Sequence, residues 1–241
     1  MDNQQENINN DYVIRTQNLS RIYEGIVPVK AVNNVDLTVE KGEFTALVGP
    51  SGSGKTTLLN LIGGLDSPTS GHVWIHGQNI THLSKNKLID FRLRNIGFVF
   101  QAYNLIPVLT ARENVEFVML LQKVPHELRN ARVDQLLQQV GLSEQGSKKP
   151  GKLSGGQQQR IAVARALASK PQFVLADEPT ANLDSKTATN LLDMMAKLNK
   201  DEGITFIFST HDQRVIERAR RVITLVDGAV ESDVTKDAMV A

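Results

Sequence analysis

The run of residues 49–56 has the residue types and the spacing that hold a nucleoside triphosphate. It reads Gly-Pro-Ser-Gly-Ser-Gly-Lys-Thr and fits the pattern G-x-x-x-x-G-K-[ST] at every specified position. The glycines let the backbone adopt positive φ angles and point several N–H groups at one anion. Lys55 can then reach the β and γ phosphates, and the hydroxyl of Thr56 can bind Mg²⁺. The predicted nucleotide contacts of this phosphate loop are Gly49, Pro50, Ser51, Gly52, Ser53, Gly54, Lys55, Thr56 and the following Thr57.

The segments on either side of the phosphate loop argue against an ordinary glycine-rich turn. Residues 44–48 before it have the apolar pattern of a buried strand, and residues 57–62 after it have a helical pattern. The helix that starts near Gly54 adds the positive end of its dipole to the site. The sequence therefore predicts strand, loop and helix in the order that nucleotide binding needs.

A second site for chemistry follows the apolar strand at residues 173–176. Asp177 and Glu178 come directly after it, at the end of the strand where open α/β sheets bind ligands. Asp177 is predicted to hold Mg²⁺, directly or through water, and Glu178 to polarise the attacking water as a general base. Taken alone, these acids would more often lie in a solvated turn. Beside a phosphate loop, the catalytic interpretation is favoured.

The composition excludes several other classes of function. The 241 residues contain no cysteine, so disulfides, thiolate metal sites and thiol redox chemistry are ruled out. The chain has 27 basic and 26 acidic residues and a net charge of +1, which predicts no nucleic-acid partner. The longest wholly apolar run is residues 117–121, much shorter than a membrane span, and the N-terminus has no apolar signal core.

The hydrophobic patterns divide the chain into three regions. The first is rich in strands, the second (85–168) is mainly helical, and the third alternates strand and helix, which implies a parallel sheet. The predicted strands are 13–16, 35–39, 44–48, 71–75, 96–100, 173–176, 204–208 and 222–226, and the predicted helices beyond the phosphate loop are 111–122, 126–140, 156–167, 186–200 and 212–219.

The run Leu-Ser-Gly-Gly-Gln at residues 153–157, ahead of a helix, resembles the signature motif of ATP-binding cassette (ABC) ATPases. The resemblance extends from about residue 12 to residue 226. It implies an α/β fold with a P-loop NTPase core, a mainly parallel sheet, an N-terminal antiparallel β portion and an inserted helical subdomain at about 89–168. The implied ATPase domain is 12–228, with a flexible N-terminal tail at 1–11 and a C-terminal tail at 229–241.

The resemblance also implies roles for single residues. Tyr23 stands where the family stacks an aromatic ring on adenine, and Gln101 follows a strand as the glutamine that contacts metal and water. His211, after Phe-Ser-Thr, matches the switch histidine that contacts the γ-phosphate, and residues 182–184 match the D-loop. The implied catalytic residues are Glu178, His211 and Gln101; the implied metal ligands are Thr56, Gln101 and Asp177.

Such cassettes work as head-to-tail dimers, so the resemblance implies that one chain is half of an active site. Ser154, Gly155, Gly156 and Gln157 would close on the γ-phosphate held by a second copy, and Asp184 would also contribute to the nucleotide site. The implied cofactors are ATP and Mg²⁺. Because the chain has no membrane segment of its own, it would act through a separate integral permease at the cytoplasmic face of the cell membrane.

The sequences of residues 99–107, 109–115 and 179–184 resemble those of the bacterial lipoprotein-release and macrolide-export branch of the family. Ala181 departs from this resemblance, because glycine is expected at that position. That branch exports substrates or transmits force across the membrane. An amino-acid importer, and a cassette that regulates a cell-wall enzyme through a membrane partner, remain alternatives. A cassette that acts on DNA or ribosomes is disfavoured, because the chain has neither a coiled-coil insertion nor a second cassette.

Overall fold

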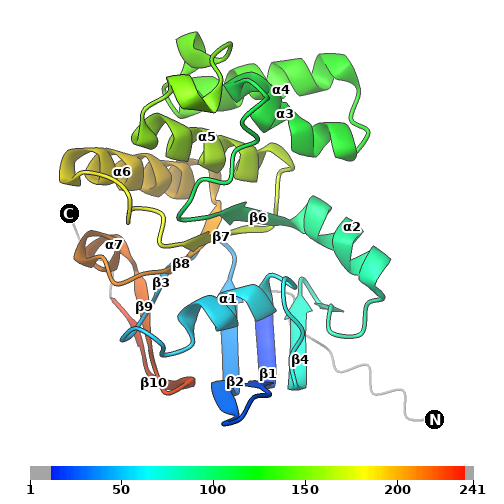
Figure 1. The fold of residues 1–241 in the computed structure, drawn as a ribbon, viewed down its shortest axis with the longest axis vertical. Coiled ribbons are helices and arrows are strands. Elements are labelled where there is room, and N and C mark those ends of the chain that lie inside the picture. Colours follow the sequence, from blue (N-terminus) through cyan, green and yellow to red (C-terminus); the bar gives the residue numbers. More distant parts are fainter. Residues whose placement is uncertain (1–11, 237–241) are drawn as a thin grey trace.

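The computed structural model describes residues 12–236, and Figure 1 shows their strands and helices in layers. The predicted tail at 1–11 lies outside the described residues. Three helices, α3 (Ala111–Leu121), α4 (His126–Gln139) and α5 (Gly155–Ala168), lie together at the top of the view. A six-stranded sheet lies beneath them, and a second, four-stranded sheet lies at the bottom. The chain therefore has a helical part above a two-sheet body.

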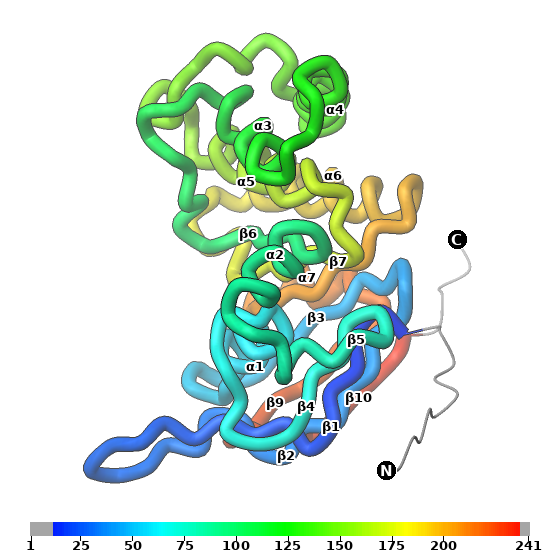
Figure 2. The backbone as a smooth tube through the Cα atoms, turned by 90° about the vertical axis from the view of Figure 1, so that its right-hand side faces the viewer, coloured from blue at the N-terminus to red at the C-terminus, as the bar shows by residue number. Residues whose placement is uncertain are grey.

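The four-stranded sheet is antiparallel, as predicted for the N-terminal portion. It has the order β2-β1-β4-β5, formed by β1 (Tyr12–Tyr23), β2 (Val29–Glu40), β4 (Ser70–Ile75) and β5 (Gln78–Asn79). β1 and β2 are longer than the predicted 13–16 and 35–39, because register shifts interrupt the alternation of apolar and polar residues along them. The hairpin that joins them, residues 24–28, projects from the body (Figure 2).

The six-stranded sheet is mainly parallel, which confirms the predicted P-loop NTPase core. Its order is β10-β9-β3-β8-β7-β6, and all neighbours are parallel except β10 and β9. The strands are β3 (Phe44–Val48), β6 (Ile96–Val99), β7 (Phe173–Asp177), β8 (Thr205–Ser209), β9 (Arg221–Val226) and β10 (Ala229–Thr235). The carboxyl ends of β3 and β7 place the phosphate loop and the two acids at one edge of the sheet.

One predicted boundary is wrong. Residues 229–235 form strand β10, so the predicted C-terminal tail does not start at 229; a turn at residues 227–228 sends the chain back along β9. The strand predicted at 96–100 within the helical region is confirmed as β6, which pairs with β7 in the main sheet. Ile96 and Val99 of that strand are buried in the sheet, so the wholly helical part begins after it.

The remaining helices cover the sheets. They are α1 (Lys55–Ile62), α2 (Lys85–Asn95), α6 (Ser185–Glu202) and α7 (Gln213–Arg218), with short 3-10 turns η1 (Ser143–Gln145) and η2 (Pro150–Lys152). Sequence patterns do not delimit α2, because none of its residues is buried and it has no apolar stripe. Across residues 12–236, no helix has both the length and the apolar character needed to cross a bilayer.

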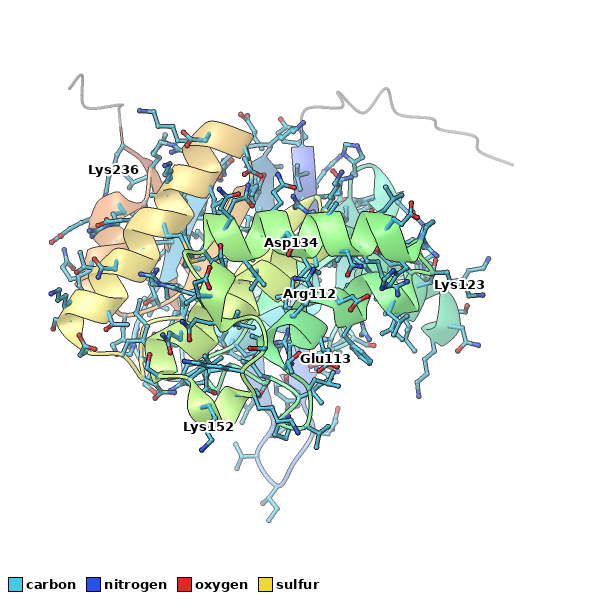
Figure 3. All side chains as sticks on the ribbon, turned by 90° about the horizontal axis from the view of Figure 1, so that it is seen from above. Arg112, Glu113, Lys123, Asp134, Lys152 and Lys236 are labelled. Atoms are coloured by element: carbon cyan, nitrogen blue, oxygen red, sulfur yellow. The ribbon has the colours of Figure 1, made fainter. Side chains whose placement is uncertain are left out.

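The main sheet separates two hydrophobic cores, because successive side chains of a strand face opposite sides. On β7, Val174 and Ala176 pack toward the side of helices α3 to α6, whereas Phe173 and Leu175 pack with α1 and the antiparallel sheet. Ion pairs hold the helical part together at its surface. Arg112 of α3 contacts Asp134 of α4 at 2.6 Å (Figure 3). Both cores are built against β7, which carries the two acids.

Candidate functional site

The phosphate loop is held in place by close contacts on both sides. Gly49 has φ 146°, and a Cβ atom there would lie 2.1 Å from the carbonyl oxygen of Leu225. Gly54 has φ 99°, and a Cβ atom there would lie 2.1 Å from the carbonyl oxygen of Ala31. Only glycine fits at either position, because both the backbone angle and the space exclude a side chain. The loop is therefore fixed between β2 and β9, directly ahead of α1.

A cleft of about 610 Å³ lies over the phosphate loop. It brings together residues that are far apart in the sequence, since Gln101, Glu178 and His211 line it beside the loop. The other lining residues are Ala31, Gly49, Pro50, Ser51, Gly52, Gly54, Lys55, Thr56, Thr57, Ala181 and Ser209. Ser53 does not line the cleft and is buried beneath the loop. Three predicted catalytic residues and the loop thus share one cavity of the size that small-molecule ligands occupy.

The two halves of the predicted metal site meet directly. The hydroxyl of Thr56, at the start of α1, donates to Oδ1 of Asp177 at 3.1 Å, across 121 positions of sequence. Lys55 keeps its ammonium group over the loop, where Nζ donates to the carbonyl oxygens of Gly49 at 2.8 Å and Pro50 at 2.9 Å. The ammonium group of Lys55, the hydroxyl of Thr56 and the carboxylate of Asp177 therefore lie together at the phosphate loop.

Glu178 is held by its neighbours from several directions. Its backbone has φ 45°, in the left-handed region, and its N–H donates to the carbonyl oxygen of Ser209 at 2.9 Å. The carboxylate contacts His211 Nδ1 at 2.7 Å and accepts from the hydroxyl of Thr210 at 3.3 Å. The Glu178 side chain is 17% exposed and His211 is 77% exposed, so the carboxylate is sheltered and the imidazole faces outward. Strained backbone of this kind is typical of functional positions.

Sequence reasoning missed the residues that support this pair. Asp212 accepts from the hydroxyl of Thr180 at 2.6 Å, and its N–H donates to Thr210 at 3.0 Å. The hydrogen bond and charge of Arg214 lower the pKa of the Asp212 carboxyl to about 2, so it is ionised at neutral pH. The segment after Glu178 is thereby tied to the segment that carries His211. In the sequence, these supporting residues are marked only by their closeness to predicted catalytic residues: Thr180 is two positions after Glu178, and Asp212 follows His211.

The signature residues lie outside the cleft of their own chain. Ser154 is exposed at the N-terminus of α5, where its hydroxyl accepts from the N–H of Gln157 and Gln157 Oε1 accepts from the N–H of Ser154. A Cβ atom on Gly156 would lie 2.1 Å from Cγ2 of Thr187, and one on Gly155 would lie 2.8 Å from the hydroxyl of Tyr103. These glycines therefore have a packing role within the chain as well as the one predicted from the resemblance.

Two other predicted nucleotide contacts also lie away from the cleft lining. Tyr23 is 40% exposed at the end of β1, with the guanidinium of Arg21 4.6 Å from its ring centre and its hydroxyl donating to Asp66 at 2.8 Å. Asp184 caps α6 by accepting from the N–H of Thr187 at 2.9 Å, and the hydrogen bonds from Thr187 lower its pKa. One face of the Tyr23 ring is thus already covered by Arg21.

Known proteins share most of this sequence's length. The ABC transporter family model matches residues 32–181. The lipoprotein-releasing system ATP-binding protein LolD 1 of Rhodopseudomonas palustris is 45% identical over 221 residues, which cover 90% of this chain and 98% of that protein. The macrolide export ATP-binding/permease protein MacB of Hyphomonas neptunium is 46% identical over 92% of this chain, but only 34% of that longer protein is covered.

Solved structures agree with the sequence comparison. The cassette MJ0796, a protein of Methanocaldococcus jannaschii, was solved as a dimer in a post-hydrolysis state bound to ADP and Pi. It superposes on this chain with a TM-score of 0.86 and 42% identity, over 94% of this chain and all of that one. The same cassette was also solved in a second dimeric structure.

Proposed function

The chain belongs to the ABC transporter family, and we propose that it hydrolyses ATP in order to drive a separate membrane permease. The observation that carries this proposal is the shared cleft, in which Gln101, Glu178 and His211 surround the phosphate loop. Phosphoryl transfer needs positioning and electrostatic stabilisation rather than a protein nucleophile, and this cleft supplies both. The relatives named for lipoprotein release and macrolide export favour that branch over amino-acid import or regulation of a cell-wall enzyme.

We propose the following roles within one chain. The loop N–H groups and Lys55 bind the phosphates, and Glu178 accepts a proton from the attacking water while His211 orients its carboxylate. Thr56, Asp177 and Gln101 are the proposed ligands of Mg²⁺, which would neutralise charge on the phosphates. Their oxygens suit a hard cation. Among residues 12–236 no cluster of three or more acids or histidines could hold a metal alone.

The complete site is proposed to need a second copy of the chain. Ser154, Gly155 and Gly156 do not line the cleft of their own chain. Ser154 is exposed and Gly155 is half-buried, so the start of α5 can meet the nucleotide of a partner, whereas Gly156 is buried. The positive end of the α5 dipole, at its N-terminus, suits the γ-phosphate. Gln157 and Asp184 would join the same interface, and Tyr23 would contact the adenine on its uncovered face.

An apolar groove lies between α2, α3, β6 and α5. It has a volume of about 430 Å³ and an apolar lining that includes Leu65, Ile89, Leu93, Phe98, Phe100 and Leu121. Ile89 and Leu121 are 47% and 52% exposed, which is typical of a surface that a partner covers. We propose that a cytoplasmic segment of the permease binds here, which would hold the chain at the cytoplasmic face of the membrane.

The groove is tested by replacing Leu121 with aspartate. Leu121→Asp is expected to abolish co-purification of an integral membrane protein from detergent extracts, because a carboxylate would be buried against the apolar partner. Leu128→Asp is the matched control, since Leu128 is 62% exposed on α4 and does not line the groove. Equal recovery of the membrane protein with both variants, or its absence with the unaltered chain, would contradict the proposed docking.

A further inference from the structure

Four main-chain carbonyl groups in residues 100–104 accept hydrogen bonds from side chains of distant segments. Gln159 Nε2 donates to Phe100 at 3.3 Å, and Asn182 Nδ2 donates to Gln101 at 2.9 Å. Arg165 donates to Tyr103 at 2.9 Å and to Asn104 at 2.5 Å. We call the three donors, Gln159, Arg165 and Asn182, the carbonyl clamp. The clamp fixes the segment that carries Gln101 to helix α5 and to the segment after Glu178.

Gln159 is the buried centre of the clamp. It is 0% exposed, and its Nε2 donates to the carbonyl of Pro179 at 2.8 Å as well as to that of Phe100. Carbonyl oxygens only accept hydrogen bonds, so both contacts require the amide nitrogen and fix the orientation of the side chain. Its Oε1 is buried without a partner among residues 12–236. A buried polar group kept at such a cost is expected to have a role beyond filling space.

The two carbonyls that Gln159 joins flank the proposed catalytic residues. Phe100 directly precedes Gln101, and Pro179 directly follows Glu178. The clamped backbone is strained, because Tyr103 and Asn104 have φ 61° and 49°. Backbone of this kind persists only where neighbouring groups hold it. Gln159 therefore sets the distance between two loops whose side chains share the cleft.

We propose that Gln159 is a positioning residue for ATP hydrolysis, which holds the loops of Gln101 and Glu178 in register. The proposal rests on the proposed function of the cleft. Gln159 belongs to α5, the helix that begins at Ser154, and the clamp residue Arg165 lines the proposed permease groove together with Phe100 and Asn104. The clamp thus connects the signature helix, the groove and the catalytic cleft through contacts within one chain.

The test replaces Gln159 with methionine, which keeps the length of the side chain and removes the amide group that donates both hydrogen bonds. Gln159→Met is expected to lower kcat by about tenfold or more, because small errors in the position of catalytic groups cost large factors in rate. The KM for ATP should stay within about twofold, because the phosphate loop is untouched. Independently of activity, hydrogen exchange without nucleotide should speed up at Tyr103, whose N–H donates to the Phe100 carbonyl.

The matched control is Asn199→Leu. Asn199 is a second buried amide, 3% exposed, that donates to the carbonyls of Gly42, at 2.8 Å, and Ile204, at 2.6 Å, away from the cleft. It should lower Tm without changing kcat at a temperature where the variant is folded. If Gln159→Met does not fold, Asn182→Ala takes its place. Asn182 is exposed, and its replacement by alanine removes the hydrogen bond to the Gln101 carbonyl. The same loss of kcat at constant KM is expected.

The proposal is overturned if the clamp variant keeps the wild-type kcat, or if its kcat falls no more than that of Asn199→Leu. Unchanged hydrogen exchange at Tyr103 in Gln159→Met would also overturn it. Failure of the proposed function itself has a different signature, since it would appear as full hydrolysis by the variant Glu178→Gln measured in parallel.

Discussion

Replacing Glu178 with glutamine is expected to abolish ATP turnover while leaving ATP binding intact. Glutamine has nearly the same shape, so contacts with His211 and Thr210 can persist, but the side chain no longer takes a proton from water. Loss of a general base is expected to lower kcat by a factor on the order of 10² to 10⁴. The phosphate loop and Lys55 remain unaltered, so nucleotide affinity should stay close to that of the wild type. Phosphate release and equilibrium nucleotide binding are the measurements.

The same variant should accumulate as a dimer when ATP and Mg²⁺ are added. In the proposed dimer the γ-phosphate bridges the two copies and hydrolysis removes it, so a chain that cannot hydrolyse ATP should remain closed. Light scattering measures this directly. Glu217→Gln is the control, because it removes the charge of an exposed glutamate on α7. A Glu178→Gln chain that binds ATP and stays monomeric would contradict the shared site.

Replacing Ser154 with arginine is expected to inactivate hydrolysis with little loss of nucleotide affinity in the monomer. Ser154 is exposed and lies outside the cleft of its own chain, so a large side chain there leaves the phosphate loop unaltered. In the dimer, that side chain would occupy the space where the signature helix meets the partner's nucleotide. Turnover should fall by about two orders of magnitude or more, because the site cannot close.

Ser143→Arg is the matched control for Ser154→Arg, since Ser143 is an exposed serine at the start of η1 in the same helical part. It should keep wild-type turnover. Nucleotide affinity is best measured below the concentration at which dimers form. A marked loss of affinity in monomeric Ser154→Arg would indicate that Ser154 acts on its own chain.

The phosphate loop and the two acids could be predicted from sequence because their chemistry is local. Each motif adjoins its own strand, and parallel strands present their carboxyl ends at one edge, so the meeting of Thr56 and Asp177 followed from the pattern. The support around Glu178 could not be predicted in this way. The contact of Thr180 with Asp212 spans 32 residues, and the contact of Gln159 with Phe100 spans 59, and no periodic pattern marks either.

Other differences have equally physical causes. The sequence does not mark β10 as a strand, because only Ala229, Val230 and Val234 of its seven residues are apolar, and most of the strand is exposed. Gly155 and Gly156 could be assigned from the motif to nucleotide contact alone. Their packing against Tyr103 and Thr187 becomes visible only when α5 is placed beside its neighbours. Glycine at these two positions can be required both by nucleotide contact and by packing, and the sequence alone does not separate the two reasons.

Each ATP site is proposed to be built from two chains, and a mixture of two inactive variants is the test. Ser154→Arg disables the signature helix, and Lys55→Ala disables the phosphate loop. In a mixed dimer, the intact loop of the first variant faces the intact signature helix of the second, which restores one complete site. An equal mixture should therefore recover up to about a quarter of wild-type turnover, because half of the dimers are mixed and each has one good site of two. If the signature residues served their own chain, every site would carry a defect and the mixture would stay as inactive as its components.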